Sequence, residues 1–201
     1  MSLGEPGFAV LGFRPHTYWT AVVALGGQAD APRVLDRRRL VFAAEAERFV
    51  YHRAAEGSAG EAASRIDGVR AATERNVARE IGRLLDELRQ AGAATRLAVT
   101  PTSNAKPSDL QEILRTHSRI HAAEGSFYRD VVAAGCELAG LAVHRLAERE
   151  FAAAVCAHLG VDRPALETRL KAMGAELGPP WGEDYRLATL AAWTALDKPP
   201  H

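Results

Sequence analysis

Apolar runs separated by turn-forming residues dominate the start of the chain, a pattern typical of short strands. Three such runs lie at 8–13, 17–25 and 33–42, and the second is rich in β-branched and aromatic side chains. Pro15 and Gly26 fall where the first two runs end and indicate turns. Residues 36–39 are all charged, which indicates an exposed edge or a bulge. We therefore expect an antiparallel meander of three strands, which residues 48–53 could extend.

A helical period follows a segment at 54–69 that predicts a loop or a weak helix. Apolar side chains then recur at intervals of three and four residues, forming one stripe made of Val77, Ile81, Leu84, Leu85 and Leu88. Gly92 ends this helix as a C-cap residue. Ser108-x-x-Gln111 is a capping box, which predicts a second long helix running from there to about Leu138.

Strands and helices alternate through the rest of the chain. We expect further strands at 95–100 and 141–146, and helices at 148–159, 164–176 and 183–196. The resulting order is β-β-β-α-β-α-β-α, with extra helical material before the last helix. A meander followed by strand–helix alternation predicts an α/β fold whose mixed, five-stranded sheet is flanked by helices. At this length we expect a single domain covering residues 1–201.

Composition and charge exclude several classes of protein. The chain has 25 basic and 25 acidic residues, so its formal net charge of zero argues against a strongly basic polyanion binder. No apolar run approaches the ~18 residues of a membrane span, and the N-terminus lacks the pattern of a secretory signal. We therefore expect a cytoplasmic protein with no membrane partner. Phosphate-binding loops, dinucleotide-binding motifs, Cys-x-x-Cys pairs and nucleophile elbows are absent from the sequence.

Three short motifs carry a resemblance to a known superfamily. Residues 11–16 read Leu-Gly-Phe-Arg-Pro-His, where that superfamily typically shows Gly-x-Asp-Pro-Gly. The strand at 141–146 is followed by an acidic passage at 148–150, and the last helix opens with Gly-Glu-Asp at 182–184 before an Ala-rich stretch. With its order of elements, the chain resembles the RNase H-like superfamily, particularly its RuvC-type and YqgF-type resolvase-like members.

The resemblance implies a nuclease site but also a departure from it. In such nucleases, carboxylates from separate elements hold two divalent cations, Mg²⁺ or Mn²⁺, ~4 Å apart. Here Arg14 stands at the position of the first-strand Asp, and an Arg cannot ligate a cation. The strand at 95–100 also ends without an acid, which leaves Asp184 and either Glu148 or Glu150. We expect a divergent RuvC-like or YqgF-like protein that lacks the standard two-metal site and binds nucleic acid, another phosphorylated ligand, or a protein partner such as a second copy.

Polar side chains at two predicted strand ends are candidates for that binding. Arg14 and His16 follow the first strand, and an Arg guanidinium can bind a phosphate or a carboxylate through two nitrogens. Thr102 and Ser103 follow the strand at 95–100, and loops at strand carboxyl ends often bind ligands. The alternatives are a turn stiffened by Pro15 and an ordinary polar connection.

A histidine-rich helix face suggests a second kind of chemistry. His117, His121 and Glu124 recur at i, i+4 and i+7, which places them on one face. Such a face could bind a transition metal, or Glu124 and a histidine could act as an acid–base pair. The alternative function is thus an active metal-dependent hydrolase in which His117, His121, Glu124 and Asp184 supply metal ligands, and Glu124, Asp184 and His121 act in catalysis. The same face is also typical of a groove edge in a non-catalytic structural or interaction module.

Overall fold

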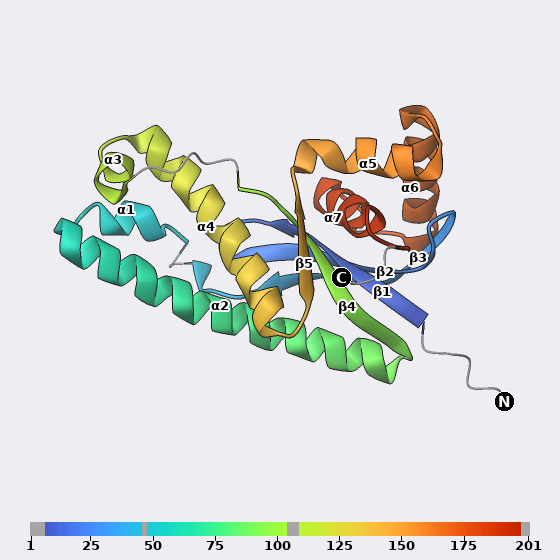
Figure 1. The fold of residues 1–201 in the computed structure, drawn as a ribbon, viewed down its shortest axis with the longest axis horizontal. Helices are drawn as coiled ribbons and strands as arrows, with labels where there is room; N and C mark the ends of the chain where they lie inside the picture. Colours follow the sequence, from blue (N-terminus) through green and yellow to red (C-terminus); the bar gives the residue numbers. More distant parts are fainter. Residues whose placement is uncertain (1–6, 46–47, 104–108, 198–201) are drawn as a thin grey trace.

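A single five-stranded mixed sheet forms the centre of the molecule in a computed structural model, which describes residues 7–45, 48–103 and 109–197 (Figure 1). The strand order across the sheet is β3-β2-β1-β4-β5. β1 pairs antiparallel with β2 and parallel with β4, β2 pairs antiparallel with β3, and β4 pairs parallel with β5. The strands are β1 (Gly7–Pro15), β2 (Trp19–Gln28), β3 (Ala31–Val41), β4 (Ala93–Pro101) and β5 (Ala142–Leu146). The predicted α/β class, the five strands and their chain order are confirmed.

Helices cover both faces of this sheet, because side chains alternate between its faces along each strand. The inward side chains of β1 divide accordingly: Leu11 and Phe13 join the core cluster beneath one helical layer, and Val10 joins the other. One layer comprises α1 (Val50–Ala54), α2 (Ala59–Gln90), α3 (Leu110–Leu114) and α4 (His117–Leu138). The other comprises η2 (Glu148–Glu150), α5 (Phe151–Leu159), α6 (Arg163–Leu177) and α7 (Glu183–Trp193).

Two sequence predictions about helix boundaries need correction. Residues 48–53 do not extend the meander, because Val50–Ala54 form the short helix α1. The helix predicted from the capping box to Leu138 is divided in two: α3 ends before Arg115, and α4 begins at His117 with Thr116 as its N-cap residue. Ser108 itself lies outside the described residues, and the side chain of Asp109 accepts the first-turn hydrogen bond of α3 instead.

The segment at 54–69 is more regular than the sequence predicted. Helix α2 begins there at Ala59, and a full capping box formed by Ser58 and Glu61 precedes its long apolar stripe. The stripe packs as predicted, with Val77, Ile81 and Leu84 buried against the sheet. No helix among the described residues is long and apolar enough to cross a membrane.

Candidate functional site at the carboxyl ends of β1 and β5

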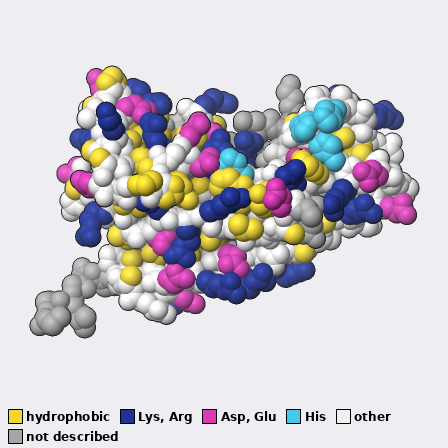
Figure 2. Space-filling view, turned by 180° about the vertical axis from the view of Figure 1, so that it is seen from behind, with side chains coloured by type: hydrophobic (Ala, Val, Ile, Leu, Met, Phe, Trp, Pro, Cys, Tyr) yellow, Lys and Arg dark blue, Asp and Glu magenta, His cyan; other side chains and the backbone are white. Residues whose placement is uncertain are grey.

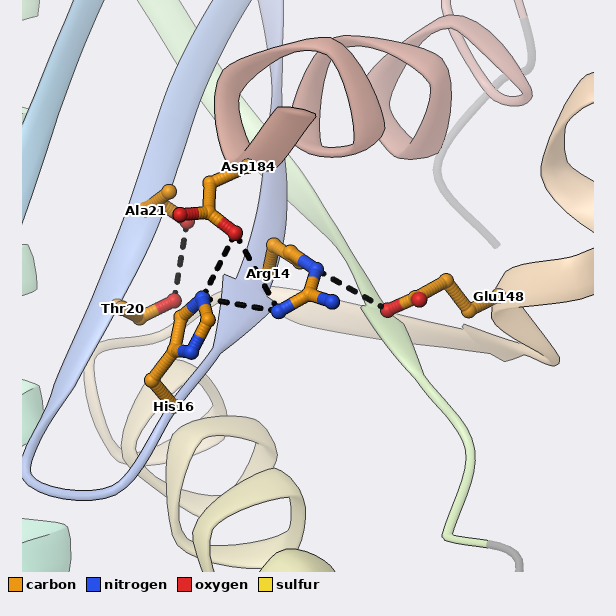
Figure 3. Close-up of polar contacts among 6 residues, drawn as sticks. All are labelled: Arg14, His16, Thr20, Ala21, Glu148 and Asp184. Carbon is orange, nitrogen blue, oxygen red and sulfur yellow. Dashed lines mark hydrogen bonds and ion pairs between the residues drawn. The ribbon is translucent and has the colours of Figure 1, made fainter. Parts of the chain in front are cut away.

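The candidate site lies where β1 and β5 end, at the same edge of the sheet because these strands run in the same direction. β1 supplies Arg14, the β1–β2 turn supplies His16, and η2 supplies Glu148 directly after β5. Asp184 reaches the same place from the first turn of α7. Figure 3 shows the four side chains pointing toward one another from these separate elements.

Arg14 lies between the two carboxylates of this site. Its Nη1 is 3.3 Å from Oδ1 of Asp184, and its Nε is 3.6 Å from Oε2 of Glu148 (Figure 3). The Arg14 side chain is 23% exposed, and those of Glu148 and Asp184 are about one-third exposed, at 33% and 34%. A single fixed positive charge therefore lies between the two acidic groups and offsets part of their negative charge at this edge.

His16 completes the arrangement from the other side of Asp184. Its Nε2 is 2.8 Å from Oδ1 of Asp184 and 2.9 Å from Nη1 of Arg14. One ring nitrogen carries either a hydrogen or a lone pair, so Nε2 cannot donate to Asp184 and accept from Arg14 at once. Donation to Asp184 is favoured, because the carboxylate oxygen can then accept from both His16 and Arg14. Asp184 is thus held by two donors from the β1 end of the sheet.

Aromatic stacking fixes the position of the His16 ring. The ring lies parallel to Trp19 with 4.1 Å between centroids, and the guanidinium of Arg39 covers Trp19 at 4.2 Å. The backbone N–H of His16 also donates to the carbonyl of Trp19 at 2.8 Å, which closes the β1–β2 turn. Neither Trp19 nor Arg39 was identified from the sequence as part of the site, because the contact of Trp19 depends on the β1–β2 turn and that of Arg39 on the pairing of β2 with β3.

The described residues at this edge do not fit a two-metal cluster. The parallel pairing of β1 with β4 extends as far as Gly12 and Val99, and two residues further along these strands stand Arg14 and Pro101. Pro101 has no side-chain oxygen, and Arg14 brings a positive charge where a cation would need a ligand. Among the described residues, Asp184 and Glu148 are the carboxylates that contact Arg14, and both pair with it.

The remaining candidates for ligand binding lie after β4. The backbone N–H of Thr102 donates to the carbonyl of Leu146 at 3.0 Å, which continues the pairing of β4 with β5. Thr102 and Ser103 are both half-buried there. Their placement at the carboxyl end of β4, between β1 and β5 in the sheet, puts them at the edge that carries Arg14.

The histidine-rich face of α4 belongs to a different part of the molecule. Glu124 is only 3% exposed, and its Oε1 accepts hydrogen bonds from the backbone of α1 and lies 3.4 Å from Nδ1 of His52. His117 and His121 are exposed and lie 2.9 Å apart through their Nε2 atoms. Among the described residues, no hydrogen bond or ion pair joins Glu124 or His121 to Asp184. The structure therefore does not bring the four predicted metal ligands into one cluster.

The run of three arginines at 37–39 makes contacts within the fold. Arg37 donates to four carbonyl oxygens at the end of α6 and in the following segment, those of Leu177, Gly178, Pro179 and Pro180. Arg38 pairs with Asp36 and Glu87, and both carboxylates hold the pKa of Arg38 above its ordinary value. Arg39 lies over the ring of Trp19, so all three arginine side chains have partners within the fold. This agrees with the edge of a sheet, where β3 lies.

Comparison with known proteins adds to this geometry. No family model matches the sequence, and no curated protein matches it. Among solved structures, the chain is similar to Thermus thermophilus RuvC in complex with a Holliday junction substrate, with a TM-score of 0.54 and 11% identity, covering 93% of this chain and 91% of that chain. Another structure of Thermus thermophilus RuvC gives a TM-score of 0.49 at 12% identity and covers 92% of each chain. The first similarity shows that this protein has the RNase H-like fold in its RuvC-like form.

Proposed function

We propose that this chain uses its RuvC-like fold to bind branched or duplex DNA and does not cleave it by two-metal chemistry. The observation that carries the proposal is the position of Arg14 between Asp184 and Glu148. Hydrolysis of a phosphodiester by two cations requires several carboxylates that are free to ligate them. At this edge a guanidinium takes that place, and it cannot activate a water molecule.

The case for DNA as the ligand comes from the fold. The similar RuvC structure holds a Holliday junction substrate, and the likeness extends over nearly the whole of both chains. The zero net charge of this chain predicts few phosphate contacts, so binding should be weak and its dependence on salt concentration should be shallow.

Arg14 is also the group best suited to receive a phosphate at this edge. Its Nη1 and Nε face Asp184 and Glu148, while Nη2 has no hydrogen bond or ion pair within the described part of the chain. The side chain is partly exposed, so Nη2 can donate to a phosphate oxygen while the two carboxylates hold the guanidinium in place. Thr102 and Ser103, at the end of β4, would supply neighbouring hydroxyl donors.

Fluorescence anisotropy with labelled four-way junction, duplex and single-stranded DNA tests this function. We expect binding at low salt that weakens as salt is raised, and no cleavage products on denaturing gels with Mg²⁺ or Mn²⁺. Arg14→Gln should weaken binding several-fold. Arg89→Gln is the matched control, because it removes the same charge from an arginine that is also paired with a carboxylate. Arg89 lies shortly before the start of β4, at the opposite edge of the sheet.

Three results would contradict the proposal in different ways. Cleavage by the wild-type protein that Asp184→Asn abolishes would show an active nuclease site. Absence of binding to every DNA form at low salt would remove DNA as the ligand. Equal loss of binding in Arg14→Gln and Arg89→Gln would place the contact surface away from the β1 edge.

A further inference from the structure

Three histidines from two helices meet on the surface away from the β1 edge. His52 lies in α1, and His117 and His121 lie one turn apart at the start of α4. One nitrogen from each ring lies within 4.8 Å of the other two, and the ring centroids are 4.3 to 5.3 Å apart. Figure 2 shows histidine side chains gathered on the surface at this end of the molecule. The cluster shares no residue with the site around Arg14.

The buried carboxylate of Glu124 explains why His52 lies at this point. Phe49, the N-cap residue of α1, provides no side-chain cap, and Oε1 of Glu124 takes over that role. It accepts from the backbone N–H groups of Tyr51 at 2.8 Å and His52 at 3.3 Å, which are otherwise unpaired in the first turn. Glu124 of α4 thus holds α1 so that His52 faces His117 and His121, which also belong to α4.

The same carboxylate orients the imidazole of His52. Nδ1 of His52 lies 3.4 Å from Oε1 of Glu124, so a hydrogen on Nδ1 points to the carboxylate and Nε2 keeps its lone pair. Histidines that ligate metals usually donate their other ring nitrogen to a carboxylate or a carbonyl in this way, which fixes the tautomer and raises the basicity of the ligand. Oε2 of Glu124 is buried and has no hydrogen-bond partner among the described residues, so one oxygen of this carboxyl group is left unpaired behind the histidines.

The nitrogens of the three rings lie close enough together to share one cation. His117 and His121 approach to 2.9 Å through their Nε2 atoms, and one hydrogen can serve only one such pair. A cation can accept lone pairs from all three rings together. A tetrahedral zinc ion with Zn–N distances of about 2.0–2.1 Å places its ligand nitrogens about 3.3 Å apart, a spacing that small rotations of these side chains reach.

We propose that His52, His117 and His121 bind a Zn²⁺ ion through one nitrogen each, with Glu124 as the carboxylate that positions His52. Imidazole nitrogens are ligands that zinc prefers, as do other late transition metals, whereas Mg²⁺ prefers oxygen ligands. His117 and His121 are exposed, so the fourth position of the ion is open to water or to an external ligand. Glu124, which the sequence predicted as a ligand, is placed behind the ligands.

Zinc titration of the full chain, stripped with a chelator and free of any histidine tag, tests the site. We expect one Zn²⁺ per chain by elemental analysis, and the absorption bands of tetrahedral Co²⁺ when cobalt replaces zinc. His117→Ala and His121→Ala should each weaken binding by more than the roughly 10–100-fold that loss of an outer-sphere partner costs. His144→Ala is the control, because His144 is exposed on β5 and outside the cluster.

Glu124→Gln separates positioning from ligation. Glutamine keeps an oxygen that can accept from the backbone of α1 but loses the charge behind His52, so zinc affinity should fall roughly 10- to 100-fold with the cobalt spectrum retained. Circular dichroism of each metal-free variant reports whether it folds. If Glu124→Gln is unstable, His117→Ala and His121→Ala still test the site, because both positions are exposed and their substitution should not prevent folding. Failure of the wild-type chain to bind zinc, or binding unchanged in both His117→Ala and His121→Ala, would overturn the proposal.

Discussion

In β1, Gly12 lies directly against the backbone of Ala188 in α7: a Cβ atom on Gly12 would be only 1.9 Å from the Ala188 carbonyl oxygen. Asp184 lies one helical turn before Ala188, and Arg14 lies two residues after Gly12, so each shares a face with its neighbour. The close approach of helix and strand therefore brings Asp184 to Arg14. The same packing that buries α7 sets the geometry of the candidate site.

Gly12→Ala should destabilise the protein. The added methyl group meets backbone atoms of α7, which cannot rotate away, so the helix must shift at a cost of about 1–3 kcal/mol in the free energy of unfolding. Urea denaturation measures this change. Gly7→Ala in the same strand meets no atom within 4 Å and should change stability by less than about 0.5 kcal/mol. Equal stabilities of the two variants would show that α7 does not pack on β1 this closely.

We expect Arg14→Asp to create a site for Mg²⁺ beside the carboxylates of this edge. The variant places a third carboxylate beside Asp184 and Glu148, so without metal it is destabilised by repulsion, and Mg²⁺ relieves that repulsion. At Mg²⁺ about tenfold above its Kd, the stabilisation is about 1.4 kcal/mol, measurable as a rise in Tm.

Arg14→Gln is the control for that variant, because it removes the same charge without adding a carboxylate. Its Tm and that of the wild-type chain should not respond to Mg²⁺. A response equal in all three proteins would place the cation elsewhere on the molecule.

Arg37→Ala should loosen the connection between α6 and α7. Arg37 donates to four backbone carbonyls there and lies over Trp181 at 5.8 Å. Loss of these charged hydrogen bonds should lower the free energy of unfolding by about 2 kcal/mol and speed hydrogen exchange in 177–182. Arg37→Lys keeps the charge but not the planar fork, so it should recover only part of the loss. Full recovery by lysine would indicate that charge alone matters.

The two cysteines should differ in reactivity. Cys136 is fully buried in α4, and burial raises the pKa of its thiol, which lowers the population of the reactive thiolate. Cys156 in α5 is only half-buried. Iodoacetamide should therefore modify Cys156 more than about tenfold faster in the folded protein, and both cysteines at similar rates in urea. Mass spectrometry of tryptic peptides gives the two rates, and equal rates in the folded state would mean that α4 opens readily.

The strands could be predicted from the sequence because each contains its own run of apolar side chains. The runs at 8–13 and 95–100 fall within β1 and β4, and their apolar residues are buried except for Phe8, which is 62% exposed. The stripe that begins at Val77 likewise marked the buried face of α2. These patterns depend on neighbours in the sequence, so they survive without knowledge of the fold.

Helix α1 shows where local pattern fails. Its residues include Val50 and Tyr51, which favour strands, and it is too short to be stable alone. The hydrogen bonds from its first turn to Glu124 stabilise the helical form, and Glu124 belongs to α4. Because His52 was expected on a strand, its position beside His117 and His121 could not be anticipated.

The sequence by itself determined the class of fold, the order of its elements and the presence of Arg14 where a carboxylate was expected. Only the tertiary structure decided that Arg14 pairs with Asp184 and Glu148, and that Glu124 stands behind His52. The physical reason is that hydrophobic periodicity is a property of neighbouring residues. A site joins side chains from distant segments, and their distances follow from how α7 packs on β1 and how α1 packs on α4.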